Sequence, residues 1–167
     1  VTVPWALYKT YGDVRMLEKH YPCIKKWIEF ISSRVRDGLW PVDYQYGDWL
    51  ALDARANSCI GVTDVSLIAS AAYARAADLA ARIADVLDRD YDARNFRALH
   101  KKIKRAYQRE FITATGRLAV NTQTAHILTL RFDLCEEEHR DRIANDLFRL
   151  IEENGDCLTT GSAGTPS

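Results

Sequence analysis

The sequence predicts an all-α fold built from helical hairpins, and three observations support this prediction. Apolar residues recur every three or four positions through most of the chain, which is the spacing of one helix face. No segment shows the clear alternation of apolar and polar residues that is typical of a strand. Short and long connections alternate between the expected helices. Hairpins stacked in this way form bundles, solenoids or toroids.

Helices are expected on both sides of Gly12 and Asp13. Gly12 is suited to end a short aromatic helix, and the Asp13 side chain can accept hydrogen bonds from the free N–H groups of the next first turn. Pro22 either kinks this next helix or opens another one at its first turn. The helical region should end near Arg36, and its apolar face carries Ile24, Trp27, Ile28, Ile31 and Val35.

A long connection follows, from Asp37 to about Val62, where the helical periodicity stops. Its roughly 26 residues far exceed the usual 2 to 8 between packed helices. Long connections in compact domains are usually functional or disordered. Aromatic side chains argue against disorder here, because they gain too much from burial to stay in water. They are Trp40, Tyr44, Tyr46 and Trp49.

The second half of the chain predicts four more helices. Thr63 or Asp64 can cap a helix whose buried face is predicted to carry Ile68, Ala72, Ala76, Leu79, Ile83 and Val86. After a tight link at residues 88–90, an antiparallel helix buries Phe96, Leu99, Ile103, Tyr107 and Phe111. Thr115 and Gly116 form a turn, a short helix is expected at 122–132, and the last helix is expected at 136–153.

Composition indicates a soluble globular protein and excludes several classes of partner. The 23 basic residues balance the 23 acidic ones, so no nucleic acid or anionic membrane partner is expected. No apolar run is long enough to span a membrane. The four cysteines are scattered singly without zinc spacing, so no metal or other cofactor is expected and the thiols are interpreted as small buried groups. The sequence leaves the cellular location open.

The stretch from Tyr44 to Leu52 places one carboxylate between aromatic rings inside the long connection. These residue types hold sugars, because ring faces cover C–H patches and a carboxylate accepts hydroxyl protons. Asp48 is therefore a candidate sugar contact beside Trp49. The alternative for Asp48 is a helix N-cap for residues 50–54.

Short motifs in a characteristic order make the chain resemble the bacterial α-L-rhamnosidases. They are Val3-Pro4-Trp5, Tyr11-Gly12-Asp13, Tyr46-Gly47-Asp48-Trp49-Leu50, Asn121-Thr122-Gln123-Thr124-Ala125 and Leu158-Thr159-Thr160-Gly161. The resemblance covers essentially the whole chain. It implies part of the six-hairpin (α/α)6 barrel of glycoside hydrolase family 78, with residues 1–167 a partial catalytic domain truncated at both ends. Ser162 departs from the family's turn, which usually has an aromatic or aliphatic residue there.

The resemblance also implies an enzyme that removes terminal α-L-rhamnose from glycosides or polysaccharides by metal-independent, inverting hydrolysis. This chemistry requires two carboxyl groups. In the family the acid lies on an upstream Asp-Arg-rich motif and the base near a downstream Trp- and Gly-rich stretch, and neither stretch is present here. We therefore expect no catalytic residue in this segment, no hydrolysis by the isolated chain, and a rhamnose-containing carbohydrate as the partner of the parent protein.

Candidate substrate-binding residues are Asp48, Trp49, Tyr46, Gln123 and His126. Gln123 lies near a helix start, where its amide either holds a loop or reaches into a cavity, or instead caps the helix or faces solvent. His126 follows on the same face and either lines the cavity or is a satisfied structural residue. Because a partial barrel exposes helix faces, self-association is also expected.

A non-catalytic helical-hairpin domain that binds a peptide or sugar is the alternative interpretation. The absence of a shared repeat length argues against it, since helical solenoids usually repeat every ~34 to 45 residues.

Overall fold

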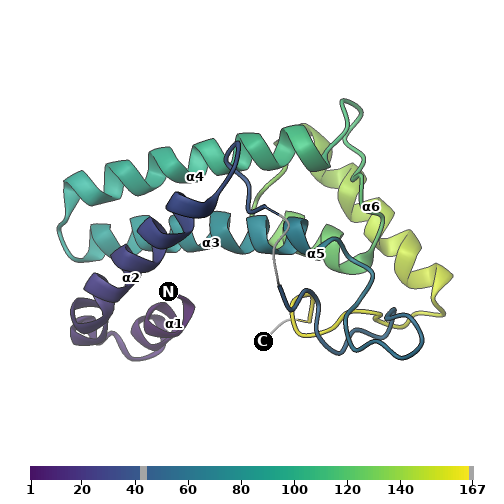
Figure 1. Ribbon diagram of the computed structural model, residues 1–167, viewed down its shortest axis with the longest axis horizontal. Coiled ribbons are helices and arrows are strands. Elements are labelled where there is room, and N and C mark those ends of the chain that lie inside the picture. Colours follow the sequence, from purple (N-terminus) through teal and green to yellow (C-terminus); the bar gives the residue numbers. More distant parts are fainter. Residues whose placement is uncertain (42–44, 166–167) are drawn as a thin grey trace.

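The computed structural model describes residues 1–41 and 45–165, and in this part of the chain it has helices and isolated bridges but no strand. The helices are α1 (Thr2–Tyr11), α2 (Val14–Arg34), α3 (Val65–Val86), α4 (Asp90–Phe111), α5 (Gln123–Arg131) and α6 (Glu137–Glu153). Figure 1 shows α3 and α4 side by side along the molecule, with α1 and α2 at one end and α5 and α6 at the other. The all-α prediction is confirmed.

The predicted boundary between α1 and α2 is confirmed by its caps. Gly12 adopts a left-handed conformation with φ of 69°, and its N–H donates to the Tyr8 carbonyl. The Asp13 carboxylate accepts from the Arg15 N–H at 3.0 Å. Pro22 lies inside a continuous α2, so the possibility that it opens another helix is wrong. Buried side chains on both sides of Pro22, including Tyr21 and Ile24, hold this part of α2 on the core.

Helices α3 and α4 form the predicted hairpin. Asp64 caps α3 by accepting from the N–H groups of Ser66 and Leu67. Only residues 87–89 separate the two helices, so α4 returns antiparallel along α3. The many alanines of α3 let the helix backbones approach closely, since a methyl side chain adds little thickness between them.

The buried face of α3 is wider than predicted. Leu79 and Ile83 are buried as expected. The other predicted positions that pack against buried clusters are only partly buried; they are Ile68, Ala76 and Val86. Ala72 is exposed, so the predicted stripe was wrong at that position. Neighbouring helices cover α3 on more than one side, because α2, α4 and α5 all pack against it. Its buried positions therefore include Leu67, Ser70, Ala71, Tyr73, Ala74, Ala77, Ala80, Ala81 and Ala84.

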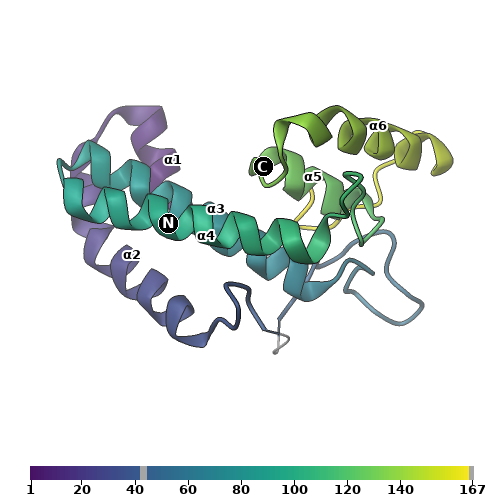
Figure 2. The ribbon, with the colours of Figure 1, turned by 90° about the horizontal axis from the view of Figure 1, so that it is seen from above.

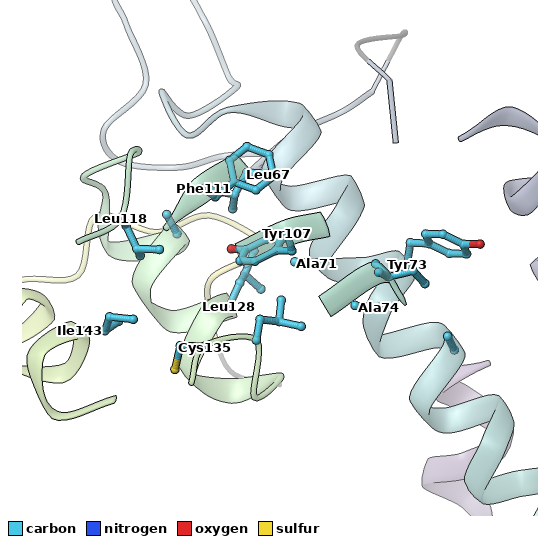
Figure 3. Close-up of a cluster of buried hydrophobic side chains, with 14 of the residues drawn as sticks. Leu67, Ala71, Tyr73, Ala74, Tyr107, Phe111, Leu118, Leu128, Cys135 and Ile143 are labelled. Atoms are coloured by element: carbon cyan, nitrogen blue, oxygen red, sulfur yellow. The ribbon is translucent and has the colours of Figure 1, made fainter. Parts of the chain in front are cut away.

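The largest buried cluster lies where α3, α4 and α5 meet (Figure 3). Tyr107 from α4 is fully buried there, and its ring packs 5.0 Å from that of Phe111. Its hydroxyl shares a 2.8 Å hydrogen bond with the Thr129 hydroxyl of α5, so the buried polar group is satisfied. Burial raises the pKa of the Tyr107 phenol well above its usual value. This cluster fixes the position of α5 relative to the α3–α4 hairpin.

A second cluster joins α1 and α2 to the other end of the hairpin. It buries Leu17, Tyr21, Ile24 and Ile28 against α3 and α4. Figure 2 shows α1 and α2 on either side of the α3–α4 pair, away from α5 and α6. None of the helices within the described ranges is long and apolar enough to cross a membrane.

The burial predicted for the cysteines is confirmed for Cys135 and wrong for Cys23 and Cys157, which are exposed; Cys59 is partly buried. Only Cys23 lies in a helix, and the isolated position of each thiol in the sequence gave no information about its burial.

Candidate functional site

The irregular segment before α3 and the segment after α6 lie side by side at one end of the molecule (Figure 1). Backbone hydrogen bonds join them. Leu52 and Asp53 both donate to the Thr159 carbonyl, at 3.0 and 3.2 Å, and Ser162 donates to the Trp49 carbonyl at 2.8 Å. The long connection is therefore ordered where the structure describes it, as predicted from its aromatic content.

Asp48 is the centre of this junction. Its carboxylate accepts hydrogen bonds from the Thr124 hydroxyl at 2.5 Å, the Gly161 N–H at 2.8 Å and the Ala163 N–H at 2.7 Å. Asp48 is 0% exposed. We call these four residues the Asp48 cluster. One buried side chain thus joins the long connection, the first turn of α5 and the C-terminal segment.

Close packing at Gly161 reinforces the cluster. A Cβ atom at this position would lie 2.3 Å from the Trp49 carbonyl oxygen, 2.6 Å from the Ala51 nitrogen and 2.8 Å from Asp48 Oδ1. Such distances leave no room for any side chain, so glycine is required for the two segments to approach. The segment at 158–161, identified from sequence as a motif, is therefore a packing surface for the loop.

Gln123, at the start of α5, also makes contacts with the C-terminal segment. Its amide nitrogen donates to the Cys157 carbonyl at 3.1 Å and to the Leu150 carbonyl at 3.3 Å, and its amide oxygen accepts from the Thr159 N–H at 2.9 Å. Gln123 is 2% exposed. Its role in the structure is to attach the C-terminal segment to α5. The cap of α5 is Thr122, whose hydroxyl accepts from the Ala125 N–H, so the capping alternative for Gln123 is wrong.

Tyr46 and Trp49 are the candidate residues that reach the surface. Tyr46 is 64% exposed and Trp49 is 39% exposed. Their rings meet edge to face, with centroids 5.9 Å apart and planes at 84°. The backbone of Trp49 is held by the Ser162 bond and by the bond between its neighbour Leu50 and Cys59, at 2.6 Å. The geometry presents a fixed aromatic pair beside a rigid loop, which suits contact with the C–H faces of a sugar.

His126 lies on α5 away from this pair and is 1% exposed. Its Nδ1 shares a 2.8 Å hydrogen bond with the Thr122 carbonyl. Burial lowers the pKa of His126 below the usual value, against a smaller opposing effect of that hydrogen bond, so the neutral ring is favoured at neutral pH. The ring borders a polar pocket together with residues of α6.

The structure brings together only some of the sequence-predicted site residues. Tyr46, Asp48 and Trp49 lie on one loop, Gln123 contacts the segment that this loop packs on, and His126 borders a separate pocket. The N-cap alternative for Asp48 is wrong, because residues 50–54 form turns rather than a helix. Tyr44 lies outside the described residues. Nothing in the structure tests substrate contact for any of the five candidates, but the complete burial of Asp48 favours a supporting role for this residue.

Sequence reasoning missed the partners of Asp48. Thr124 and Gly161 were recognised as parts of separate motifs, and Ala163 carried no signal. Their separations from Asp48, 76, 113 and 115 residues, exceed the reach of any local pattern. Within the described ranges no group of three His, Cys, Asp or Glu side chains is arranged to hold a metal ion.

Comparison with known proteins identifies the family and the relatives that this chain resembles. The family model for the bacterial alpha-L-rhamnosidase 6 hairpin glycosidase domain matches residues 1–167. An alpha-L-rhamnosidase of Streptomyces avermitilis is 37% identical over 166 residues, which cover 99% of this chain and 15% of that protein. An alpha-L-rhamnosidase of Formosa agariphila is 32% identical over 166 residues, covering 98% of this chain and 18% of the relative.

Solved structures agree with the sequence comparison. The Streptomyces avermitilis alpha-L-rhamnosidase complexed with L-rhamnose superposes with a TM-score of 0.90 at 37% identity, over 99% of this chain and 15% of that one. The α-L-rhamnosidase of Aspergillus terreus superposes with a TM-score of 0.93 at 35% identity, over 98% and 19% of the two chains. The predicted fold type, part of a six-hairpin glycosidase barrel, is confirmed.

Proposed function

Because the chain belongs to the bacterial α-L-rhamnosidase six-hairpin glycosidase family, we propose that its parent protein is a glycoside hydrolase that removes terminal α-L-rhamnose from glycosides or polysaccharides. The observation that carries this proposal is the family match over the whole chain, supported by relatives that are named as α-L-rhamnosidases. The chain spans 15% and 18% of the lengths of these two relatives. We propose that it is a partial catalytic domain whose remaining hairpins lie outside it. The enzymatic names of the relatives favour this proposal over a non-catalytic interaction domain.

The proposed reaction is an inverting hydrolysis, which needs a general acid and a general base about 6.5 to 9.5 Å apart with room for a water between them. Asp48 does not suit either role. Its oxygens already accept three hydrogen bonds inside the protein, and no part of it reaches solvent. We therefore assign the acid and the base to segments outside this chain.

The contribution of this segment to the reaction is, in our proposal, to hold the sugar. Trp49 and Tyr46 supply exposed ring surface for the C–H face of a rhamnose unit. Asp48 and Gln123 support that surface through the C-terminal segment. The hydroxyl contact expected of Asp48 from sequence is replaced in this proposal by support of Trp49 through the loop backbone, since burial removes its oxygens from solvent.

Trp49→Ala in the complete protein is expected to raise KM for an aryl α-L-rhamnoside by about tenfold, because removing an aromatic sugar contact is worth roughly 1 to 1.5 kcal/mol. Steady-state kinetics with a chromogenic substrate measures this. The matched control is Trp27→Ala, which removes a Trp of similar exposure, 46%, that also contacts another ring, that of Phe30. Equal KM values for the two variants would exclude Trp49 from the sugar site.

The isolated 167-residue chain is expected to show no hydrolysis of the same aryl α-L-rhamnoside, while the complete protein hydrolyses it. The reason is the assignment of the acid and base outside the chain. The assay compares both proteins at equal concentration over several hours. Turnover by the isolated chain would place the catalytic carboxylates within it, and a complete protein that hydrolyses other glycosides only would contradict the proposed substrate.

We also propose that the isolated chain self-associates. Large apolar side chains stand exposed on its helices, among them Trp27 and Phe30 on α2, Tyr91 on α4 and Phe148 on α6. Light scattering is expected to give an apparent mass above the 19.0 kDa of one chain, rising with concentration. A constant monomer mass over that range would refute this proposal.

A further inference from the structure

A polar pocket of about 320 Å³ lies between the turn that follows α4, the first turns of α5 and the C-terminal half of α6. It is lined by Arg117, Leu118, Asn121, His126, Asp146 and Arg149. Its volume lies at the lower end of the ~300 to 1,000 Å³ that is usual for small-molecule sites. Leu118 is the only apolar side chain among these lining residues, all of which belong to the described part of the chain, so the pocket suits a strongly hydrated ligand.

His126 gives this pocket a hydrogen-bond acceptor. The Thr122 carbonyl can only accept, so the Nδ1 atom that bonds to it carries the proton and Nε2 of the neutral ring is an acceptor. Among the described residues Nε2 has no hydrogen-bond partner, and it is not one of the fully buried unpartnered atoms, so it is open to the pocket although the residue as a whole is 1% exposed. An acceptor that is open to a pocket is available to a hydroxyl donor of a ligand.

Arg117 adds a positive charge to the lining of the pocket. Its side chain makes no hydrogen bond or ion pair with any residue that the structure describes. Its backbone, in contrast, is fixed: the Arg117 carbonyl accepts from the Thr113 N–H at 2.8 Å, and its N–H donates to the Thr113 hydroxyl at 3.0 Å. Gly116 packs so tightly on His139 of α6 that a Cβ would lie 2.6 Å from its ring. The turn thus fixes the backbone of Arg117 beside the pocket, and the exposed side chain extends from it.

Residues of α6 complete the set of polar groups. Asp146 forms ion pairs with Arg149 at 3.0 Å and with Arg142 at 4.0 Å, and its two oxygens keep lone pairs for a hydroxyl donor. The Asn121 amide offers both a donor and an acceptor. The pocket therefore combines an unpaired guanidinium, which favours a carboxylate, with several acceptors and donors suited to hydroxyl groups.

From this combination we propose that the pocket binds a carboxylate-bearing sugar, a uronic acid unit, as a carbohydrate subsite apart from the Tyr46 and Trp49 pair. The guanidinium of Arg117 pairs with the sugar carboxylate. His126 Nε2 and the Asp146 carboxylate accept from its hydroxyl groups, and the Asn121 amide is placed to bond a further one. This inference does not rest on the proposed hydrolysis of rhamnosides.

Isothermal titration calorimetry of the complete protein with D-glucuronate tests the proposal. Saturable binding is expected, and D-glucose, which differs only in having a CH2OH group in place of the carboxylate, is expected to bind at least tenfold more weakly. Arg117→Ala is expected to weaken D-glucuronate binding at least tenfold. Arg94→Ala is the matched control, because it removes an exposed guanidinium on α4 that has no ion pair within the described ranges. It is expected to leave binding unchanged.

Three results would overturn the proposal: no saturable binding of D-glucuronate by the wild-type protein, equal binding of D-glucose, or equal affinity of Arg117→Ala and Arg94→Ala. Thermal melting of both variants establishes that they are folded. Since Arg117 is exposed and its side chain supports no contact, its removal should leave the melting temperature unchanged. Calorimetry requires no turnover, so the outcome is independent of the rhamnoside assays.

Discussion

Asp48→Ala is expected to lower the free energy of unfolding by about 3 kcal/mol or more, the largest loss expected from any single side chain at this end of the molecule. The substitution leaves the Thr124 hydroxyl and the N–H groups of Gly161 and Ala163 without their acceptor. Each buried donor left unsatisfied costs about 1 to 3 kcal/mol. Urea denaturation followed by circular dichroism measures the loss. In the complete protein, rhamnoside turnover should fall with it, because the loop that carries Trp49 loses its attachment.

Asp48→Asn changes the hydrogen-bonding groups of the side chain while its volume stays nearly the same. The amide keeps one acceptor oxygen but turns an NH2 group toward a donor, so a loss of about 1 to 3 kcal/mol is expected. The matched control is Asp141→Asn, an exposed position on α6 that makes no ion pair within the described ranges, where a change within about 0.5 kcal/mol is expected. If Asp48→Asn were as neutral as the control, the Asp48 cluster would not stabilise the protein.

Gly161→Ala is expected to separate the C-terminal segment from the loop and to destabilise the protein by about 2 kcal/mol or more. The added Cβ would collide with backbone atoms of Trp49 and Ala51, at 2.3 and 2.6 Å, and backbone cannot rotate away as a side chain can. The bond from the Ser162 N–H to the Trp49 carbonyl must break or lengthen as the segments part. Hydrogen exchange at Ser162 and Leu52 should accelerate, and mass spectrometry of peptides from these segments reports it.

Gly12→Ala is the control for the cost of backbone conformation alone. Gly12 has φ of 69° with no atom within 4 Å of its added Cβ, so its substitution costs about 1 kcal/mol of strain without a collision. Exchange in the segments around Gly161 should be unchanged in this variant. Equal effects of the two substitutions on those segments would show that the close approach at Gly161 is not what holds them together.

The helices were predictable because their signals are local. Gly12, Asp13 and Asp64 act on their immediate neighbours, and the structure has Gly12 and Asp13 in their predicted roles and selects Asp64 from the two predicted caps of α3. Periodicity succeeded for α4, which has one buried face, and partly failed for α3, because neighbouring helices bury several of its faces. The sequence of a helix that is buried on several sides shows no single apolar stripe.

The location of the candidate site could be predicted from the sequence, but the roles of its residues could not. The long connection and its aromatic residues indicated an ordered loop, and the structure shows one. The role of Asp48 depends on Thr124, Gly161 and Ala163, which reach it only through the tertiary fold. A carboxylate beside a tryptophan looks the same in sequence whether it faces a sugar or the protein interior.

The Asp48 cluster also sets an order of events during synthesis. Asp48 leaves the ribosome 113 residues before Gly161, the first of its two backbone donors. At about 5 to 20 residues per second, this separation corresponds to roughly 6 to 23 s. Throughout that interval the carboxylate can be satisfied only by water and, later, by Thr124. The loop that carries Tyr46 and Trp49 therefore reaches its final shape after all of the helices α1 to α6 have been made, as the last described segment of the chain emerges.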